Sequence, residues 1–174
     1  MNTEPLVYLR GQFVPASQAS VKIYDAGIVL GATVTEMTRT FRHQPFRLED
    51  HVARLFRSLK YTRMETGLSP ADVLSISREL LAHNTALIKP EEELGLIHFV
   101  TAGEYPVYAG SAASGGPMTP TVCVHTFPLP FNVWSQRMKE GAHVVTPSIR
   151  HVPPQCFDHK MKYRSRKHYY LADQ

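Results

Sequence analysis

The chain has 174 residues, of which 43% are hydrophobic and 20% are charged, and its formal net charge is +4. This composition is typical of a globular protein, and the length fits one domain or two small ones. The mild basic excess suits an anionic ligand and gives little support for nucleic-acid binding. The two cysteines lie in no Cys/His ligand spacing, so neither a metal site nor a disulfide framework is expected. The N-terminus has no signal pattern and no apolar run reaches a membrane span, which predicts a cytoplasmic protein.

The first three quarters of the chain alternate between strand-like and helical patterns. A turn is expected at Arg10-Gly11, and His43-Gln44-Pro45 interrupts a run rich in Thr, Val and Phe. Ser69 followed by Pro70 predicts the start of a helix. In chain order we expect short strands within 5–27, a hairpin over about 33–48, helices over 48–65 and 69–84, a buried strand over 93–103, a loop of small residues over 108–120 and a strand over 121–127.

The segment Pro-Leu-Pro-Phe-Asn at 128–132 has no periodicity and is the expected hinge between two domains. It separates an N-terminal α/β domain, residues 1–127, from residues 133–174. Only about forty residues follow it, which is too few to bury a core of their own. That region either packs onto the first domain or begins a larger one. Its expected elements are a short helix near 133–140, a strand over 142–150, a loop over 151–158 and a final helix from about residue 163.

Two groups of polar residues could carry chemistry in the first domain. Placed at 100° intervals, four side chains of the helix after residue 48 share the flank beside its apolar face: Arg47, His51, Arg54 and Ser58. Two guanidinium forks with an imidazole and a hydroxyl can hold a phosphate, although a polar helix edge gives the same pattern. Glu36 and Arg39 are three residues apart on an expected strand, so they face opposite ways, and both could be simple surface charges.

The end of the chain holds a dense basic cluster: Lys160, Lys162, Arg164, Arg166 and Lys167. A lysine among cations near a buried strand end could have a lowered pKa and act as a nucleophile. If Lys162 began the last helix, Arg166 would share its face. A solvated basic face and a nucleic-acid contact are the other interpretations, and the residue types alone do not select among the three.

Four segments together resemble the class IV pyridoxal-phosphate (PLP) aminotransferases, which include branched-chain and D-amino-acid aminotransferases and aminodeoxychorismate lyases. The opening Val-Tyr-Leu-Arg-Gly-Gln-Phe-Val-Pro and the helix pattern H-x-x-R-L are two of them. The others are D-x-G-x-x-x-G-x-x-x-x-E-x-x-R, starting at Asp25, and the run from Val145 to Tyr163. The resemblance covers the chain from about Val7 onward. It implies an α+β, two-domain PLP fold of type IV, with a complete small domain and the start of the larger one.

The resemblance also implies roles for individual residues. In H-x-x-R-L the arginine binds the cofactor phosphate, which assigns that role to Arg54. The family pattern D-x-x-x-K, counted from Asp158, assigns the lysine that holds PLP as a Schiff base to Lys162 and not to Lys160. This lysine then moves protons at the substrate α-carbon. Glu36 occupies a position where the aminotransferases carry glutamate and the lyases tend to carry threonine.

Other positions bear on the substrate pocket. Arg39 falls where branched-chain-type members have an arginine near the substrate. Thr35 replaces the usual aromatic residue before the glutamate, and Ala102 replaces an arginine with which the D-amino-acid enzymes trap the substrate carboxylate. The family continues for roughly a hundred residues beyond its lysine, in a part that supplies the acidic partner of the pyridine nitrogen. We therefore expect a shortened chain.

The expected function is PLP-dependent transfer of an amino group between an amino acid and a 2-oxo acid. Two alternatives stay open: an aminodeoxychorismate lyase that eliminates pyruvate, and a non-catalytic dimerisation or binding fragment. The resemblance implies a homodimer with amino-acid and 2-oxo-acid substrates. Neither a metal, a membrane nor nucleic acid is expected as a partner.

Overall fold

The computed structural model describes residues 4–110 and 118–174. Much of the expected loop over 108–120 therefore lies outside the described residues. The elements are β1 (Leu6–Leu9), β2 (Gln12–Pro15), the short 3-10 helix η1 (Ala16–Gln18), α1 (Ala26–Val29), β3 (Thr33–Phe41), β4 (Gln44–Pro45), α2 (Leu48–Thr62), α3 (Pro70–Thr85), β5 (Leu94–Thr101), β6 (Thr121–Pro128), α4 (Phe131–Glu140) and α5 (Lys167–Ala172).

The described strands form one sheet in the order β2-β1-β6-β5-β3-β4, and every neighbouring pair is antiparallel. The predicted first turn is confirmed, because Arg10 and Gly11 have φ values of 50° and 89° and join β1 to β2. The hairpin over 33–48 is also confirmed. Its turn lies one residue earlier than the predicted interruption, at Arg42 and His43, and Gln44–Pro45 form the short β4.

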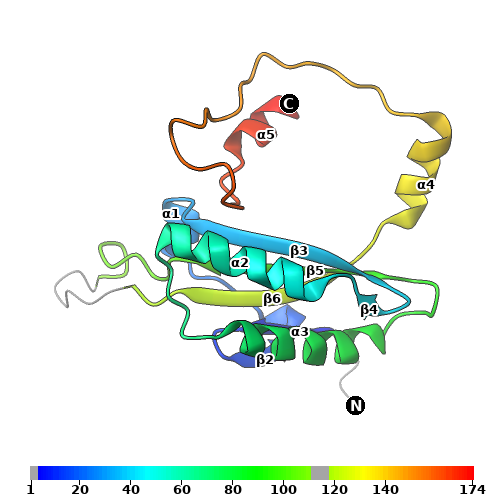
Figure 1. Ribbon diagram of the computed structural model, residues 1–174, viewed down its shortest axis with the longest axis horizontal. Coiled ribbons are helices and arrows are strands. Elements are labelled where there is room, and N and C mark those ends of the chain that lie inside the picture. Colours follow the sequence, from blue (N-terminus) through cyan, green and yellow to red (C-terminus); the bar gives the residue numbers. More distant parts are fainter. Residues whose placement is uncertain (1–3, 111–117) are drawn as a thin grey trace.

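Helices α2 and α3 cover one face of the sheet, as Figure 1 shows. The sequence predicted one apolar face on the first helix, made of Leu48, Val52, Leu55, Phe56 and Leu59. All of these residues are buried except Phe56, which is partly buried against the core. The second helix begins as predicted with Pro70 in its first turn, and Ser69 and Asp72 form a reciprocal capping box. Neither α2 nor α3 covers the opposite face of the sheet. Large side chains on that face, such as Met37 and Phe41, are exposed.

The chain beyond β6 differs from the rest in burial, because no residue of 131–174 is buried. The predicted short helix is confirmed as α4. The strand predicted over 142–150 is wrong: the segment is irregular, and Val144 and Val145 are 84% and 65% exposed. A strand needs a neighbour for its backbone hydrogen bonds, and no described strand lies beside this one. The domain division at 128–132 stays a prediction.

The segment then returns to the sheet, as the orange and red part of Figure 1 shows. Tyr163 forms an antiparallel bridge with Val34, and the backbone N–H of Thr35 donates to the Lys162 carbonyl at 2.9 Å. Residues 162–164 thus lie along the edge of β3 that β4 leaves free, since β4 pairs only with Thr40 and Phe41. This extended pairing explains why the last helix begins at Lys167 and not near 163. Lys162 and Arg166 therefore do not share a helical face.

Candidate active site

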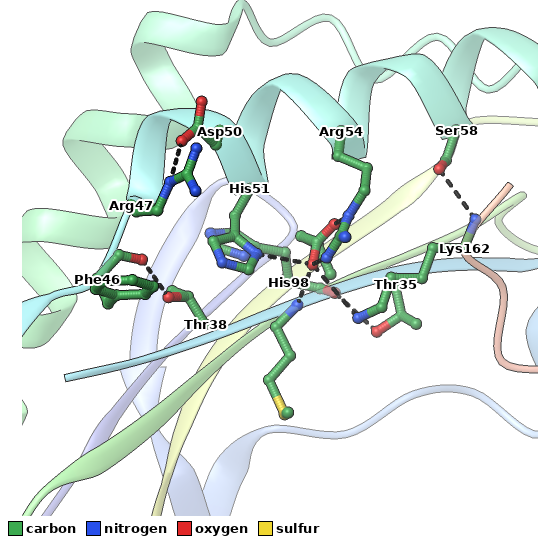
Figure 2. Close-up of polar contacts among 12 residues, drawn as sticks. Thr35, Thr38, Phe46, Arg47, Asp50, His51, Arg54, Ser58, His98 and Lys162 are labelled. Atoms are coloured by element: carbon green, nitrogen blue, oxygen red, sulfur yellow. Dashed lines mark hydrogen bonds and ion pairs between the residues drawn. The ribbon is translucent and has the colours of Figure 1, made fainter. Parts of the chain in front are cut away.

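Glu36 carries a fully buried carboxylate that contacts three charged or titratable side chains, and Figure 2 shows these three, His51, Arg54 and Lys162, pointing toward one another. Its side chain points from β3 toward α2. Arg54 donates to both carboxylate oxygens, at 2.5 and 2.6 Å, in the bidentate geometry that is strongest for this pair. His51 Nδ1 lies 3.0 Å from Oε1, and Lys162 Nζ lies 3.4 Å from the same oxygen. A single carboxylate therefore holds an arginine, a histidine and a lysine from two distant parts of the sequence.

Helix α2 positions three of the four side chains that the sequence placed on one flank. His51 and Arg54 contact Glu36, and the buried hydroxyl of Ser58 accepts a hydrogen bond from the Lys162 backbone N–H at 3.1 Å. Arg47 does not reach this cluster and instead pairs with Asp50 on the surface. Lys162 is therefore held at its backbone by the hydrogen bond to Ser58 and at its side-chain amine by the contact with Glu36.

The charges in this cluster shift one another's pKa values. Burial alone would raise the pKa of Glu36, but hydrogen bonds from Arg54, His51 and the Met37 N–H outweigh it and hold the pKa at about 2. Burial lowers the pKa of the Lys162 ammonium below its ordinary value, and the attraction of Glu36 only partly opposes this. Glu36 is therefore ionised at neutral pH, and Lys162 loses its proton more readily than an exposed lysine.

Two pockets border the cluster. One of about 410 Å³ is lined by Phe46, Arg47, Asp50, His51, Ala53, Arg54 and Arg57. The other, of about 180 Å³, is lined by His151, His159, Met161, Lys162, Tyr163, Arg166 and Tyr169. The first gathers three arginines and the second contains the amine. Arg54 is 43% exposed and points only one edge of its guanidinium at Glu36, so it keeps donors for a second anion.

This donor set fits PLP in chemical terms. The cofactor needs an amine that is neutral often enough to react with an aldehyde, and cations for a phosphate. Lys162 has the lowered pKa and Arg54 the spare donors. Among the described residues, no group of three or more His, Cys, Asp or Glu side chains could hold a metal ion. No described helix is long and apolar enough to cross a membrane.

The two remaining pocket candidates lie apart from the Glu36 carboxylate. Arg39 faces the opposite side of β3, as its three-residue spacing predicted, and its guanidinium lies 4.0 Å from the Phe41 ring centroid and 5.0 Å from that of Phe131. Thr35 contributes its backbone to the pairing with Lys162, while its hydroxyl donates to the His98 carbonyl at 3.1 Å. The structure therefore brings Glu36, Arg54 and Lys162 together and leaves Arg39 outside.

The sequence did not single out His98, which lies opposite Glu36 across β3 and β5. The Ser77 hydroxyl donates to the Val73 carbonyl at 2.6 Å, so the His98 ring donates to Ser77 through Nε2, 2.8 Å away. Nδ1 is then unprotonated, and it has no partner in the described part of the chain. Burial lowers the pKa of His98 to about 4. Its alternation with buried residues in Leu94–Thr101 was the signal that could have placed it inside.

The family model for amino-transferase class IV matches residues 33–174, which include every residue of the Glu36 cluster. The chain belongs to this family. A D-alanine aminotransferase of Bacillus licheniformis is 30% identical over 123 residues, which are 71% of this chain and 41% of the relative. An aminodeoxychorismate lyase of Bacillus subtilis is 30% identical over 79 residues, or 45% of this chain and 27% of the relative.

Solved structures show the same fold. The T.th. branched-chain amino acid aminotransferase complexed with N-(5'-phosphopyridoxyl)-L-glutamate has a TM-score of 0.77 at 21% identity, over 97% of this chain and 53% of that chain. The corresponding enzyme from Escherichia coli gives 0.59 at 19% identity, over 72% and 41%. The match confirms the predicted fold class of the PLP aminotransferases. This chain spans about half the length, or less, of these relatives.

Proposed function

We propose that this protein binds PLP and transfers an amino group between an amino acid and a 2-oxo acid. The observation that carries the proposal is the meeting of Lys162 and Arg54 within hydrogen-bond distance of one buried carboxylate, that of Glu36. Family membership supports the same reaction class. When bound, PLP supplies an electron sink that weakens the bonds at the substrate α-carbon.

Lys162 would hold PLP through its side-chain amine, and the same amine would move the proton at the substrate α-carbon. Two features of the structure suit it to this work. Its backbone is fixed by Ser58 and by pairing with β3, so the amine has a defined position. Its pKa is lowered by burial, so the neutral, reactive amine forms nearer to neutral pH than it does for an exposed lysine.

Arg54 binds the cofactor phosphate in this proposal, and Glu36 orients Arg54. The carboxylate holds one edge of the guanidinium and so aims the remaining donors at the bordering pocket. Glu36 also attracts the Lys162 ammonium, which opposes loss of its proton. Arg39 and Thr35 remain candidates for contacts with substrate on the other side of β3.

The test uses the full-length gene product. With PLP, an amino acid and 2-oxoglutarate, we expect glutamate to accumulate, and we expect a change in visible absorbance when PLP is added alone. Lys162→Ala is the control and should abolish both. An unchanged spectrum in both proteins would refute cofactor binding, and would favour the non-catalytic alternative if the protein is folded.

A lyase is the second candidate, because an aminodeoxychorismate lyase is among the relatives. Product analysis separates the two reactions: pyruvate released from aminodeoxychorismate indicates the lyase, and glutamate formed from 2-oxoglutarate indicates the aminotransferase. Glu36, where the lyases tend to carry threonine, favours the aminotransferase. We further propose that the protein is a cytoplasmic homodimer, and sedimentation of the full-length protein tests the dimer.

A further inference from the structure

Lys160 and Lys162 are two positions apart in the part of the chain that reaches the edge of β3. The pairing there is short: the Thr35 N–H donates to the Lys162 carbonyl at 2.9 Å, and Tyr163 forms one bridge with Val34. Side chains of an extended segment alternate with a period of two, so a slip of two residues would bring Lys160 to the place of Lys162. A pairing this short specifies its register weakly, and contacts outside it therefore matter.

Asp158 closes a tight turn just before the paired segment. Its carboxylate accepts a hydrogen bond from the Lys160 N–H at 2.7 Å, and its carbonyl accepts one from the Met161 N–H at 3.1 Å. Aspartate favours such turns because its short side chain reaches the backbone N–H two residues further on. The turn takes up residues 158–161, so it sets the position in the chain at which the pairing with β3 begins.

Helix α2 holds both ends of this turn. The Tyr61 hydroxyl donates to the Asp158 carboxylate, and this hydrogen bond raises the pKa of Tyr61. The Lys160 N–H and the Tyr61 hydroxyl together hold the pKa of Asp158 below its usual value. One helical turn earlier, the buried hydroxyl of Ser58 accepts from the Lys162 N–H at 3.1 Å. Residues three apart lie on the same helix face, so Ser58 and Tyr61 give the short segment two fixed points.

This register places the two lysines differently. The side chain of Lys162 is 28% exposed, and its Nζ lies 3.4 Å from a carboxylate oxygen of Glu36. Lys160 is exposed, and within the described ranges 4–110 and 118–174 it forms no ion pair with Glu36. A slip of two residues would exchange these environments and would break the hydrogen bond between Lys162 and Ser58.

We propose that Asp158 and Tyr61 are positioning residues that hold the register of residues 162–164 on β3. This register selects the Lys162 amine, and not that of Lys160, for the reaction with PLP. In that reaction the neutral amine adds to the aldehyde carbon, and the aldehyde oxygen leaves as water with the two amine protons. The selection rests on the proposed function, since it needs PLP to react with a lysine, whereas the register does not.

The experiment measures the register of the full-length protein without PLP and its consequence with PLP. Without PLP, hydrogen exchange of the Lys162 and Arg164 amides reports the register, because their N–H groups donate to Ser58 and to Thr33. With PLP, borohydride reduction and peptide mass spectrometry give the ratio of the adduct at Lys162 to that at Lys160.

The variants test the turn and its contact with α2 separately. Asp158→Ala removes the carboxylate, Asp158→Asn keeps an oxygen that accepts from the same donors, and Tyr61→Phe removes only the hydroxyl. Asp173→Ala and Tyr108→Phe are the matched controls, because both residues are exposed and lie outside these contacts. The amide of Val100, in the central strand β5, is the internal reference for global unfolding.

We expect Asp158→Ala to speed exchange of the Lys162 and Arg164 amides by about tenfold, with Val100 unchanged, and to lower the adduct ratio by a similar factor. Asp158→Asn should stay close to the wild type in both measurements. Tyr61→Phe should change both in the same direction by less, since it keeps the turn. Should Asp158→Ala fail to fold, Tyr61→Phe decides by the same measurements.

Exchange rates and an adduct ratio equal to those of the wild type in Asp158→Ala and Tyr61→Phe would overturn the proposal. Faster exchange with an unchanged ratio would also overturn it, because Asp158 would then stabilise the segment without selecting the lysine. A wild type that forms no adduct would refute the proposed function and, with it, the selection of Lys162. The exchange rates, measured without PLP, would still decide whether Asp158 and Tyr61 hold the register.

Discussion

Arg54 on α2 donates two hydrogen bonds to Glu36 on β3, joining helix and sheet through a carboxylate that is fully buried. Removing one partner of such a pair leaves the other uncompensated, and this costs more than a surface pair would. Arg54 is partly exposed, so water offsets some of the loss. The pair also connects the candidate phosphate ligand to the candidate amine, because Lys162 contacts the same carboxylate.

Replacing Glu36 with glutamine should destabilise the protein and change the pH dependence of Lys162. We expect a loss of about 1–3 kcal/mol in the free energy of unfolding at pH 7. The neutral amine reacts with PLP, so the rate of attachment rises with pH through the Lys162 pKa. Glu36 raises that pKa, and Glu36→Gln should therefore move the midpoint to lower pH. Stopped-flow absorbance across the pH range measures it, and a midpoint that stays or rises would refute the electrostatic role.

Arg54→Met should weaken PLP binding because it removes the cation next to the bordering pocket. One or two charge-assisted hydrogen bonds to a phosphate correspond to a rise of about 10- to 100-fold in the PLP dissociation constant. Equilibrium titration of visible absorbance gives the constant. Arg78→Met, which removes a surface arginine on α3, is the matched control. Equal affinities in the two variants would show that Arg54 is a structural residue only.

His98 should make the protein sensitive to mild acid. Its pKa is about 4 in the folded protein, against 6.5 for an ordinary histidine, so the unfolded chain takes up a proton first. Its contribution to stability is full above pH 6.5 and falls as the pH approaches 4, by roughly 3 kcal/mol in all. His98→Gln keeps a donor for Ser77 and does not titrate. Urea unfolding between pH 7 and about 4.5 should show a smaller slope for the variant, whereas parallel curves would contradict this account.

Asn84 joins α3 to two strands. Its side-chain oxygen accepts from the Leu6 N–H at 2.8 Å, and its amide donates to the Leu6 carbonyl and the Thr126 hydroxyl at 2.9 and 2.8 Å. Asn84→Ala leaves these part-buried partners without their hydrogen bonds to the side chain and should cost about 2–4 kcal/mol. The exposed Asn132→Ala is the control and should change stability by less than about 0.5 kcal/mol. Similar losses of unfolding free energy in the two variants would show that the hydrogen bonds of Asn84 do not stabilise the fold.

Local patterns were enough to predict much of the fold and part of the site. The 100° spacing on α2 placed His51, Arg54 and Ser58 on one flank, and all three contact the site. The resemblance added Lys162, which spacing within the basic cluster did not distinguish from Lys160. Its amine is the one that reaches Glu36.

Features that depend on distant contacts were not predicted. The pairing of residues 162–164 with β3 joins segments about 130 positions apart, as the Arg164 to Thr33 hydrogen bond shows, and no local pattern encodes it. The strand expected over 142–150 was a wrong prediction, because within the described ranges 4–110 and 118–174 its β-branched residues have no neighbouring strand to pair with. Arg164 was counted only as one member of a charged cluster, because the aromatic ring beneath it lies on another strand.

The most direct test of the account is to find which lysine carries PLP. The full-length protein is incubated with PLP, reduced with borohydride, digested and analysed by peptide mass spectrometry. We predict one reduced adduct at Lys162, absent from Lys162→Ala and retained in Lys160→Ala, whose lysine forms no ion pair with Glu36 in the described structure. An adduct at Lys160, or labelling spread over the basic cluster with none favoured at Lys162, would contradict it.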